Sequence, residues 1–164
     1  MKLSKAFFQT IGIVTMLAQL PTGKSLKSQE MSTRMQVSHS YLLKIAKKLK
    51  NRGIITSSAS KIGGYSLAKN PDDISFLDLF DAVESNESFH ENFSIEVASG
   101  FFITPKLVEE KSENLISYLN KAENAYRNVL ASYYLSDILP HDEKNNLVVI
   151  DWQKILSDTD KDKN

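Results

Sequence analysis

Residues 37–69 constrain the fold of this chain more than any other segment. Near their start is Ser38, a residue type that caps helix starts, and Gly53 stands where a helix would end. Between them, apolar residues recur at helical spacing and form one stripe, namely Leu42, Ile45, Ala46 and Leu49. Two short β-like runs follow, at residues 54–57 and 65–67. A helix followed by a two-stranded ribbon is the layout of a winged helix-turn-helix, whose helix enters the DNA major groove.

The segment before Ser38 predicts the other helix of this motif. Ser28 can cap a short helix over residues 28–35, with Met31 and Met35 facing inward. A tight turn at Gln36 then leads into the second, basic helix. Two short helices joined in this way are the helix-turn-helix signature.

We expect the DNA contacts to come from the start of each helix, the polar face of the second helix and the wing. Base edges and phosphates would meet the first turns, and lysines and glycine backbone would hold phosphates. The candidate DNA-binding residues are Ser28, Ser38, His39, Ser40, Tyr41, Lys44, Lys47, Lys48, Lys61, Gly63, Gly64 and Tyr65.

The charge of the chain is divided between its halves. Residues 1–69 hold 12 Lys and Arg against one acidic residue, Glu30, for a net charge of +11. Residues 70–164 hold 8 Lys and Arg against 19 Asp and Glu, for a net charge of −11. This asymmetry favours a front half that binds a polyanion, because the basic charge coincides with a motif that can use it.

Residues 1–20 carry two lysines and a mostly apolar run, as a secretion signal does, but polar residues interrupt that run. We therefore expect a buried first helix in which Phe7, Ile11, Val14 and Ala18 share one stripe. After the wing, Ser75 opens a helix over residues 76–84 with core spacing.

Thr104 and Pro105 form a strong helix start, and the helix is expected to continue to about Leu139, before Pro140. A helix of that length is too long for a small domain to bury alone, so its apolar seam predicts dimerisation. The expected dimer-interface residues are Val108, Leu115, Leu119, Ala122, Tyr126, Val129 and Tyr133.

Residues 85–104 have no clean period and read as a connecting loop with partial helix, which could receive a small-molecule or protein effector. The speculative effector residues are Phe89, His90, Phe93, Phe101 and Phe102. His90 with nearby glutamates could form a weak metal site, although solvated loop charges are the stronger interpretation. The chain has no cysteine, so we expect no Cys-ligated iron–sulfur cluster and no metal. No catalytic motif is present, so we expect no enzyme.

Four segments together resemble the Rrf2 family of bacterial winged-helix regulators, which includes IscR, NsrR and CymR. They are the MKLSK opening, SHSYLLKIAKKLKNRGII, the GGYSLAK wing and ISFLDLFDAVE, and they cover roughly residues 1–84. The resemblance implies a homodimeric DNA-binding transcription regulator, often a repressor, with the long helix as its dimer interface. It also implies a cytoplasmic protein with a double-stranded DNA operator as partner.

The chain departs from the family pattern in three places. Members with an iron–sulfur cluster carry three cysteines in the region that matches residues 85–103, and this chain has none. Many members have an acidic base-reading residue where Leu43 stands. Many also have an Arg near the wing start and a Gly-Pro-Gly tip. Here those places hold residues 59–62, so we expect Lys61 to take over the minor-groove role.

The sequence thus predicts a mainly α protein with a small β-wing, a winged helix-turn-helix domain plus a long dimerisation helix. The expected parts are the DNA-binding domain (1–84), a connecting loop and possible effector region (85–104), the dimerisation helix (105–139) and a C-terminal tail (140–164). Two alternatives stay open: a winged-helix module for protein contacts, and a protein that responds to a small molecule or metal through the 85–104 loop.

Overall fold

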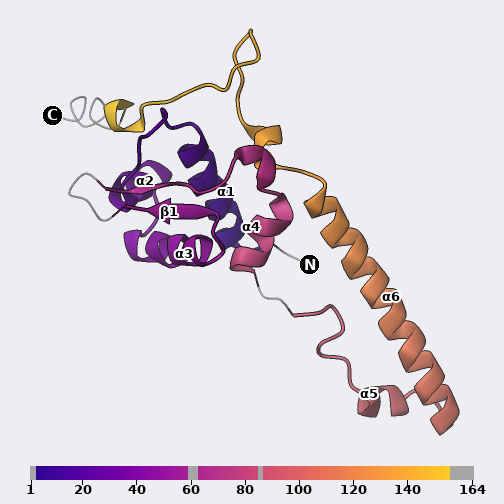
Figure 1. Cartoon of the computed structure of the whole chain (residues 1–164). Helices are drawn as coiled ribbons and strands as arrows, with labels where there is room; N and C mark the ends of the chain where they lie inside the picture. Colours follow the sequence, from indigo (N-terminus) through magenta and orange to yellow (C-terminus); the bar gives the residue numbers. More distant parts are fainter. Residues whose placement is uncertain (1–2, 59–62, 85–86, 156–164) are drawn as a thin grey trace. The chain divides into compact units, whose positions relative to one another are not determined.

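The computed structural model describes residues 3–58, 63–84 and 87–155 (Figure 1). The chain divides into two compact units: unit 1 comprises residues 1–84 and 133–164, and unit 2 comprises residues 85–132. The expected mainly α fold with a small β-wing is confirmed. None of the helices within the described ranges is long and apolar enough to span a membrane.

Unit 1 contains the helix-turn-helix and the wing. Its elements are α1 (Lys5–Ala18), α2 (Ser28–Met35), α3 (His39–Asn51), β1 (Ile55–Ser57), β2 (Tyr65–Leu67), η1 (Pro71–Asp73), α4 (Phe76–Val83) and η2 (Leu135–Ile138).

The core of unit 1 is built around α1, in which Phe7, Met16 and Leu17 are buried and Ile11 and Ala18 are half-buried. Ile13 and Val14 of this helix are inaccessible to solvent, as are Leu42 and Leu49 of α3 and Leu79 of α4. The expectation of a buried first helix is therefore confirmed. The stripe of α3 that the sequence placed in the core is buried as well.

The two helices of the motif differ from the expected capping at both starts. Ser38 is the N-cap of α3 as predicted, but its side chain forms no capping hydrogen bond. Lys27, and not Ser28, is the N-cap of α2, and its backbone N–H donates to Glu30 Oε2 at 2.7 Å. Ser28 is therefore the first helical residue, and its hydroxyl contacts His39 Nε2 at 2.8 Å instead of capping α2. Gly53 follows α3 with a φ of 66°, a left-handed conformation that favours glycine.

The wing is an antiparallel pair in which Ile55 faces Leu67 and Ser57 faces Tyr65. Leu26 extends this pair, because its backbone exchanges hydrogen bonds of 2.8 and 3.0 Å with Tyr65. A Cβ on the neighbouring Gly64 would stand 2.6 Å from the Leu26 carbonyl oxygen. Glycine is therefore required at this close approach of two backbones.

The last part of the chain returns to unit 1 through backbone pairing. The Phe76 N–H donates to the Tyr133 carbonyl at 2.9 Å, and the Leu135 N–H donates to the Ile74 carbonyl at 2.8 Å. Leu135 is completely buried as a result.

A later part of the chain contacts α1. The Ile150 N–H donates to the Gln19 carbonyl, and Trp152 Nε1 donates to the Met16 carbonyl at 3.0 Å. The C-terminal segment is thus docked on α1.

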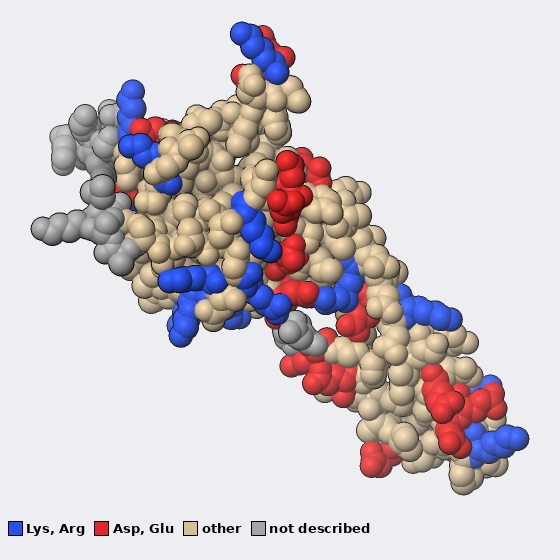
Figure 2. Space-filling view, in the orientation of Figure 1, with Lys and Arg blue, Asp and Glu red and all other residues tan. Residues whose placement is uncertain are grey.

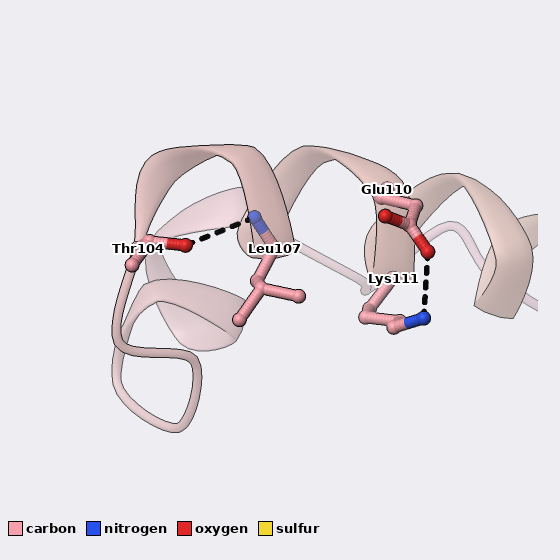
Figure 3. Close-up of polar contacts among 4 residues, drawn as sticks. All are labelled: Thr104, Leu107, Glu110 and Lys111. Atoms are coloured by element: carbon pink, nitrogen blue, oxygen red, sulfur yellow. Dashed lines mark hydrogen bonds and ion pairs between the residues drawn. The ribbon is translucent and has the colours of Figure 1, made fainter.

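Unit 2 contains α5 (Ile95–Ser99) and the long α6 (Pro105–Ala131). Thr104 caps α6 as expected, with its Oγ1 accepting from the Leu107 N–H at 3.4 Å (Figure 3). The helix ends at Ala131, so the prediction that it continues to Leu139 is wrong. The physical reason is the pairing described above, which draws residues 133–135 out of helical geometry and buries Leu135.

Candidate nucleic-acid interface

The exposed face of α3 is polar and basic. At 100° per residue, Ser40, Lys44, Lys47 and Asn51 lie within about 60° of one another, opposite the buried stripe. All four are exposed. Lysine and arginine atoms gather along α3 in the space-filling view (Figure 2). This face is positively charged, and an α-helix fits the width of the DNA major groove.

Two cations at the end of α3 are engaged with α4. Lys48 Nζ donates to the Val83 carbonyl at 3.0 Å, and an Arg52 guanidinium nitrogen donates to the Asp81 carbonyl at 2.9 Å. These carbonyls belong to the last turn of α4, where helices leave acceptors unsatisfied and carry partial negative charge. Lys48, predicted to hold a DNA phosphate, is therefore placed where it fastens α3 to α4.

The lysines nearer the middle of α3 are differently placed. Lys44 and Lys47 are exposed, and neither has an ion pair or hydrogen bond with the part of the chain that the structure describes. Both ammonium groups are therefore available for an external anion. Lys50, by contrast, donates to Ser57 Oγ at 2.8 Å, which ties the helix to the wing.

The start of α3 is organised by two side-chain contacts. Ser38 Oγ and Ser40 Oγ lie 2.9 Å apart in a hydrogen bond. His39 Nε2 lies 2.8 Å from Ser28 Oγ, so the first turns of α2 and α3 are joined by their predicted DNA-binding residues. Tyr41 follows them in the chain and is 39% exposed.

A hollow of about 430 Å³ lies between the starts of α2 and α3 and the wing. Five of the predicted DNA-binding residues line it, namely Ser28, His39, Gly63, Gly64 and Tyr65. Lys27 and Ser58 also line it. Sequence reasoning missed both, although Lys27 precedes a helix N-terminus, where anions are favoured. Lys61, the predicted minor-groove residue, lies outside the described residues.

The predicted dimer seam separates into two faces of α6. Val108, Leu119 and Tyr126 share one face and are buried or half-buried in unit 2, whereas Leu115, Ala122 and Val129 are exposed on the adjacent face. Tyr118 and Ala125 are exposed on that same face. We call Leu115, Tyr118, Ala122, Ala125 and Val129 the α6 stripe; Tyr133 lies beyond the end of α6, in unit 1.

The predicted effector residues are dispersed in unit 2. The Phe89 ring lies 6.3 Å from the Tyr126 ring, and the Phe101 and Phe102 rings are 4.8 Å apart, centroid to centroid. Phe93 is half-buried. A cavity lies between α5 and α6, and of the five predicted residues Phe102 lines it. The phenylalanines therefore do not converge on one pocket.

His90 belongs to a contact that fastens the 88–90 turn to α6. Ser88 Oγ donates to Glu123 Oε2 at 2.9 Å and lies 2.7 Å from His90 Nδ1. The Phe89 N–H also donates to Glu123 Oε2, at 3.2 Å. The Phe89 backbone hydrogen bond, followed by the Ser88 hydroxyl, lowers the pKa of Glu123 below its usual 4.5.

Comparisons with known proteins agree with this architecture. A family model described as Rrf2, iron-dependent transcriptional regulator, matches residues 3–141. YffB of Lactococcus lactis subsp. lactis (strain IL1403), whose name places it among the HTH-type transcriptional regulators, is 33% identical over 152 residues, which are 92% of this chain and 96% of that protein. The HTH-type transcriptional regulator NsrR of Halalkalibacterium halodurans is 26% identical, over 88% of this chain and 94% of NsrR.

Solved structures show the same fold. CymR of B. subtilis, described as the global cysteine regulator, superposes with a TM-score of 0.60 at 22% identity, over 84% of this chain and 95% of CymR. IscR of T. potens superposes with a TM-score of 0.59 at 23% identity, over 84% of this chain and 85% of IscR.

Proposed function

The chain belongs to the Rrf2 family and is a DNA-binding transcriptional regulator rather than an enzyme, and we propose that it represses transcription as a homodimer bound to an operator. The observation that carries this proposal is the exposed face of α3, where Lys44 and Lys47 are available for an external anion. A helix with such a face lies in the major groove when it reads DNA. We infer a cytoplasmic location, because a regulator that binds an operator acts where the bacterial chromosome lies.

In this arrangement the first turn of α3 reads bases. Ser40 and Tyr41 present hydroxyls that can donate to or accept from base edges. Leu43, which is 39% exposed, offers an apolar contact for a thymine methyl group. Lys44 and Lys47 would hold phosphates, which position the helix without reading sequence.

A second phosphate would occupy the hollow beside the wing. The start of α2 lines this hollow, and the free backbone N–H groups of a helix N-terminus favour anions; Lys27 adds a positive charge there. The Ser28–His39 hydrogen bond holds the two helix starts at a fixed separation. Ser28, His39 and the Gly63–Gly64 backbone would therefore position the DNA strand between α3 and the wing.

The α6 stripe supports a dimer. Its five residues are spaced by three, four, three and four positions, which is the spacing of a two-helix seam. Unit 2 leaves each of them exposed. A helix of 27 residues is about 40 Å long, enough for several turns of contact with the same helix of a second copy. The two DNA-binding domains of the dimer would then bind two half-sites.

The family description names iron, but the residues of this chain do not fit an iron–sulfur cluster. The sequence contains no cysteine thiolate. Across residues 3–58, 63–84 and 87–155, no group of three or more His, Asp and Glu side chains could hold a metal ion. We infer that the signal that changes operator binding is an effector that does not react with thiols. The region of residues 85–104 together with α6 would bind it.

Selection of bound sequences from a random duplex pool tests the proposed function. We expect an inverted repeat, because a symmetric dimer presents two copies of α3. Ser40→Ala should relax the preference at one position in each half-site. A selected motif without two-fold symmetry would refute the dimeric arrangement, and a pool that shows no enrichment would refute operator binding.

A further inference from the structure

The cations of α3 and its C-cap divide into two sets by their direction around the helix. Lys44 and Lys47 lie on the exposed polar face that would meet DNA. At 100° per residue, Lys48 and Arg52 are turned about 70° and about 110° from the centre of that face, and Lys50 is turned about 90° the opposite way. These three cations therefore stand on the two flanks of the helix.

On one flank, α3 is held by the end of α4. Lys48 Nζ donates to the Val83 carbonyl at 3.0 Å, and the Arg52 guanidinium donates to the Asp81 carbonyl at 2.9 Å. The last four carbonyls of a helix have no partner within it, and they carry partial negative charge. A cation is therefore a favourable donor to them, and α3 supplies a donor to two of the four.

The end of α4 is itself fixed in unit 1. Val83 is 7% exposed and belongs to the core. The next residue, Glu84, accepts from the Ser4 N–H at 2.9 Å through its Oε1, which joins the end of α4 to the start of α1. The acceptors of Lys48 and Arg52 are thus part of a fixed frame.

On the other flank, α3 is held by the wing. Lys50 Nζ donates to Ser57 Oγ in β1 at 2.8 Å. Ser57 pairs with Tyr65 in β2, and the Tyr65 backbone exchanges hydrogen bonds with Leu26. This acceptor is therefore also fixed to the body of unit 1.

Hydrogen bonds on both flanks oppose a rotation of α3 about its axis in either direction. Base recognition needs this restraint, because side chains of a binding site must be held within about 10–20° of their productive orientation. We propose that Lys48, Lys50 and Arg52 are positioning residues, which fix the rotation of α3 and so raise its preference for the operator over other DNA without holding a phosphate. The inference rests on the proposed function, in which α3 reads bases.

The test compares the full-length wild type with the triple variant Lys48→Met, Lys50→Met, Arg52→Met. Affinity is measured for the selected operator and for an unrelated duplex of equal length, over a range of salt. We expect the operator affinity to fall at least about tenfold and the unrelated duplex to lose less than about threefold. The slope of log K against log salt should change by less than about 1.

Phosphate contacts by these cations would give a different result. A dimer would lose six contacts, so both duplexes would weaken alike and the slope would become shallower by about 5. That result, or an operator preference within about twofold of the wild type, would overturn the inference. A wild type that prefers no duplex would instead refute the proposed function.

Ser57→Ala tests the wing flank without changing any charge. It should lower the operator preference as much as Lys50→Met does, about threefold to tenfold, and the double variant should lose no more than either single change. Ser57 also lines the hollow beside the wing, and a direct contact of its hydroxyl with DNA would make the two effects add, which would overturn the role of Lys50. Thr56→Ala, at an exposed neighbouring position of β1, is the matched control and should leave the preference unchanged.

Discussion

Ala122→Glu is the substitution that tests the α6 stripe most directly. Ala122 is the middle residue of the stripe and is exposed in the protomer. Glu is a good helix former, so the change should lower the stability of α6 itself by only about 0.5 kcal/mol. In a symmetric dimer the same position occurs twice, so each interface would contain two new carboxylates.

The expected weakening of the dimer can be worked from helix geometry. Packed helices have axes about 8–10 Å apart, which brings the two carboxylates to roughly 7 Å from each other. At an effective dielectric constant of about 20 they repel by about 2 kcal/mol. Partial desolvation adds about 1–3 kcal/mol, for a total of about 3–5 kcal/mol, so the dimer dissociation constant should rise by about two to four orders of magnitude.

Sedimentation velocity of Ala122→Glu and of a matched control measures this effect. Asn124→Glu introduces the same charge on an exposed position of α6 that lies about 160° from Ala122. We expect Ala122→Glu to be a monomer and Asn124→Glu to be a dimer at the same micromolar concentration. A dimer that tolerates Ala122→Glu, or one that both variants disrupt equally, would refute the assignment of the stripe.

Three further predictions concern the fold. Leu135→Ala should lower the free energy of unfolding by about 2–5 kcal/mol in urea denaturation, because Leu135 is completely buried; a change below about 1 kcal/mol would contradict the docking of residues 133–135. Gly64→Ala should displace the wing from Leu26 and weaken operator binding, measured by fluorescence anisotropy, and unaltered affinity would argue against the close approach. Folding lowers the pKa of Glu123, so its stabilisation is complete above about pH 4.5 and is lost as the pH falls. The acid limb of the wild-type stability curve should therefore be steeper than that of Glu123→Gln, and parallel limbs would exclude this contact.

The helix-turn-helix could be predicted from sequence because its signals are local. The stripe from Leu42 to Leu49 and the left-handed Gly53 are features of neighbouring residues, and each predicted its structural role correctly. The end of α6 could not be predicted in this way. Residues 132–139 continue the helical pattern without Gly or Pro, and the helix stops because Leu135 and Tyr133 pair with a segment about 60 residues earlier.

The candidate sites show the same division between local and distant information. The spacing of apolar residues predicted one apolar seam along α6. It could not separate the two faces that carry Leu119 and Ala122, because they differ by only about 60° around the helix. Which face is covered depends on how α5 and the preceding turn fold back, and this is not encoded in the helix. Likewise, the reach of Lys48 to the Val83 carbonyl depends on the packing of α3 against α4. The lysine-rich sequence of α3 does not by itself reveal this hydrogen bond.

The salt dependence of operator binding, compared between the wild type and the Lys44→Ala, Lys47→Ala double variant, tests whether α3 is the helix that lies against the DNA. A dimer of the variant lacks four cations on its α3 helices, so the slope of log K against log salt should become shallower by about 3–4. Lys144→Ala is the control, in the turn of residues 141–147 that projects from the side of unit 1 remote from α3 (Figure 1). The account predicts a steep wild-type slope that the control retains and the double variant loses. A slope that is equal in all three proteins would contradict the assignment of α3 as the DNA-reading helix.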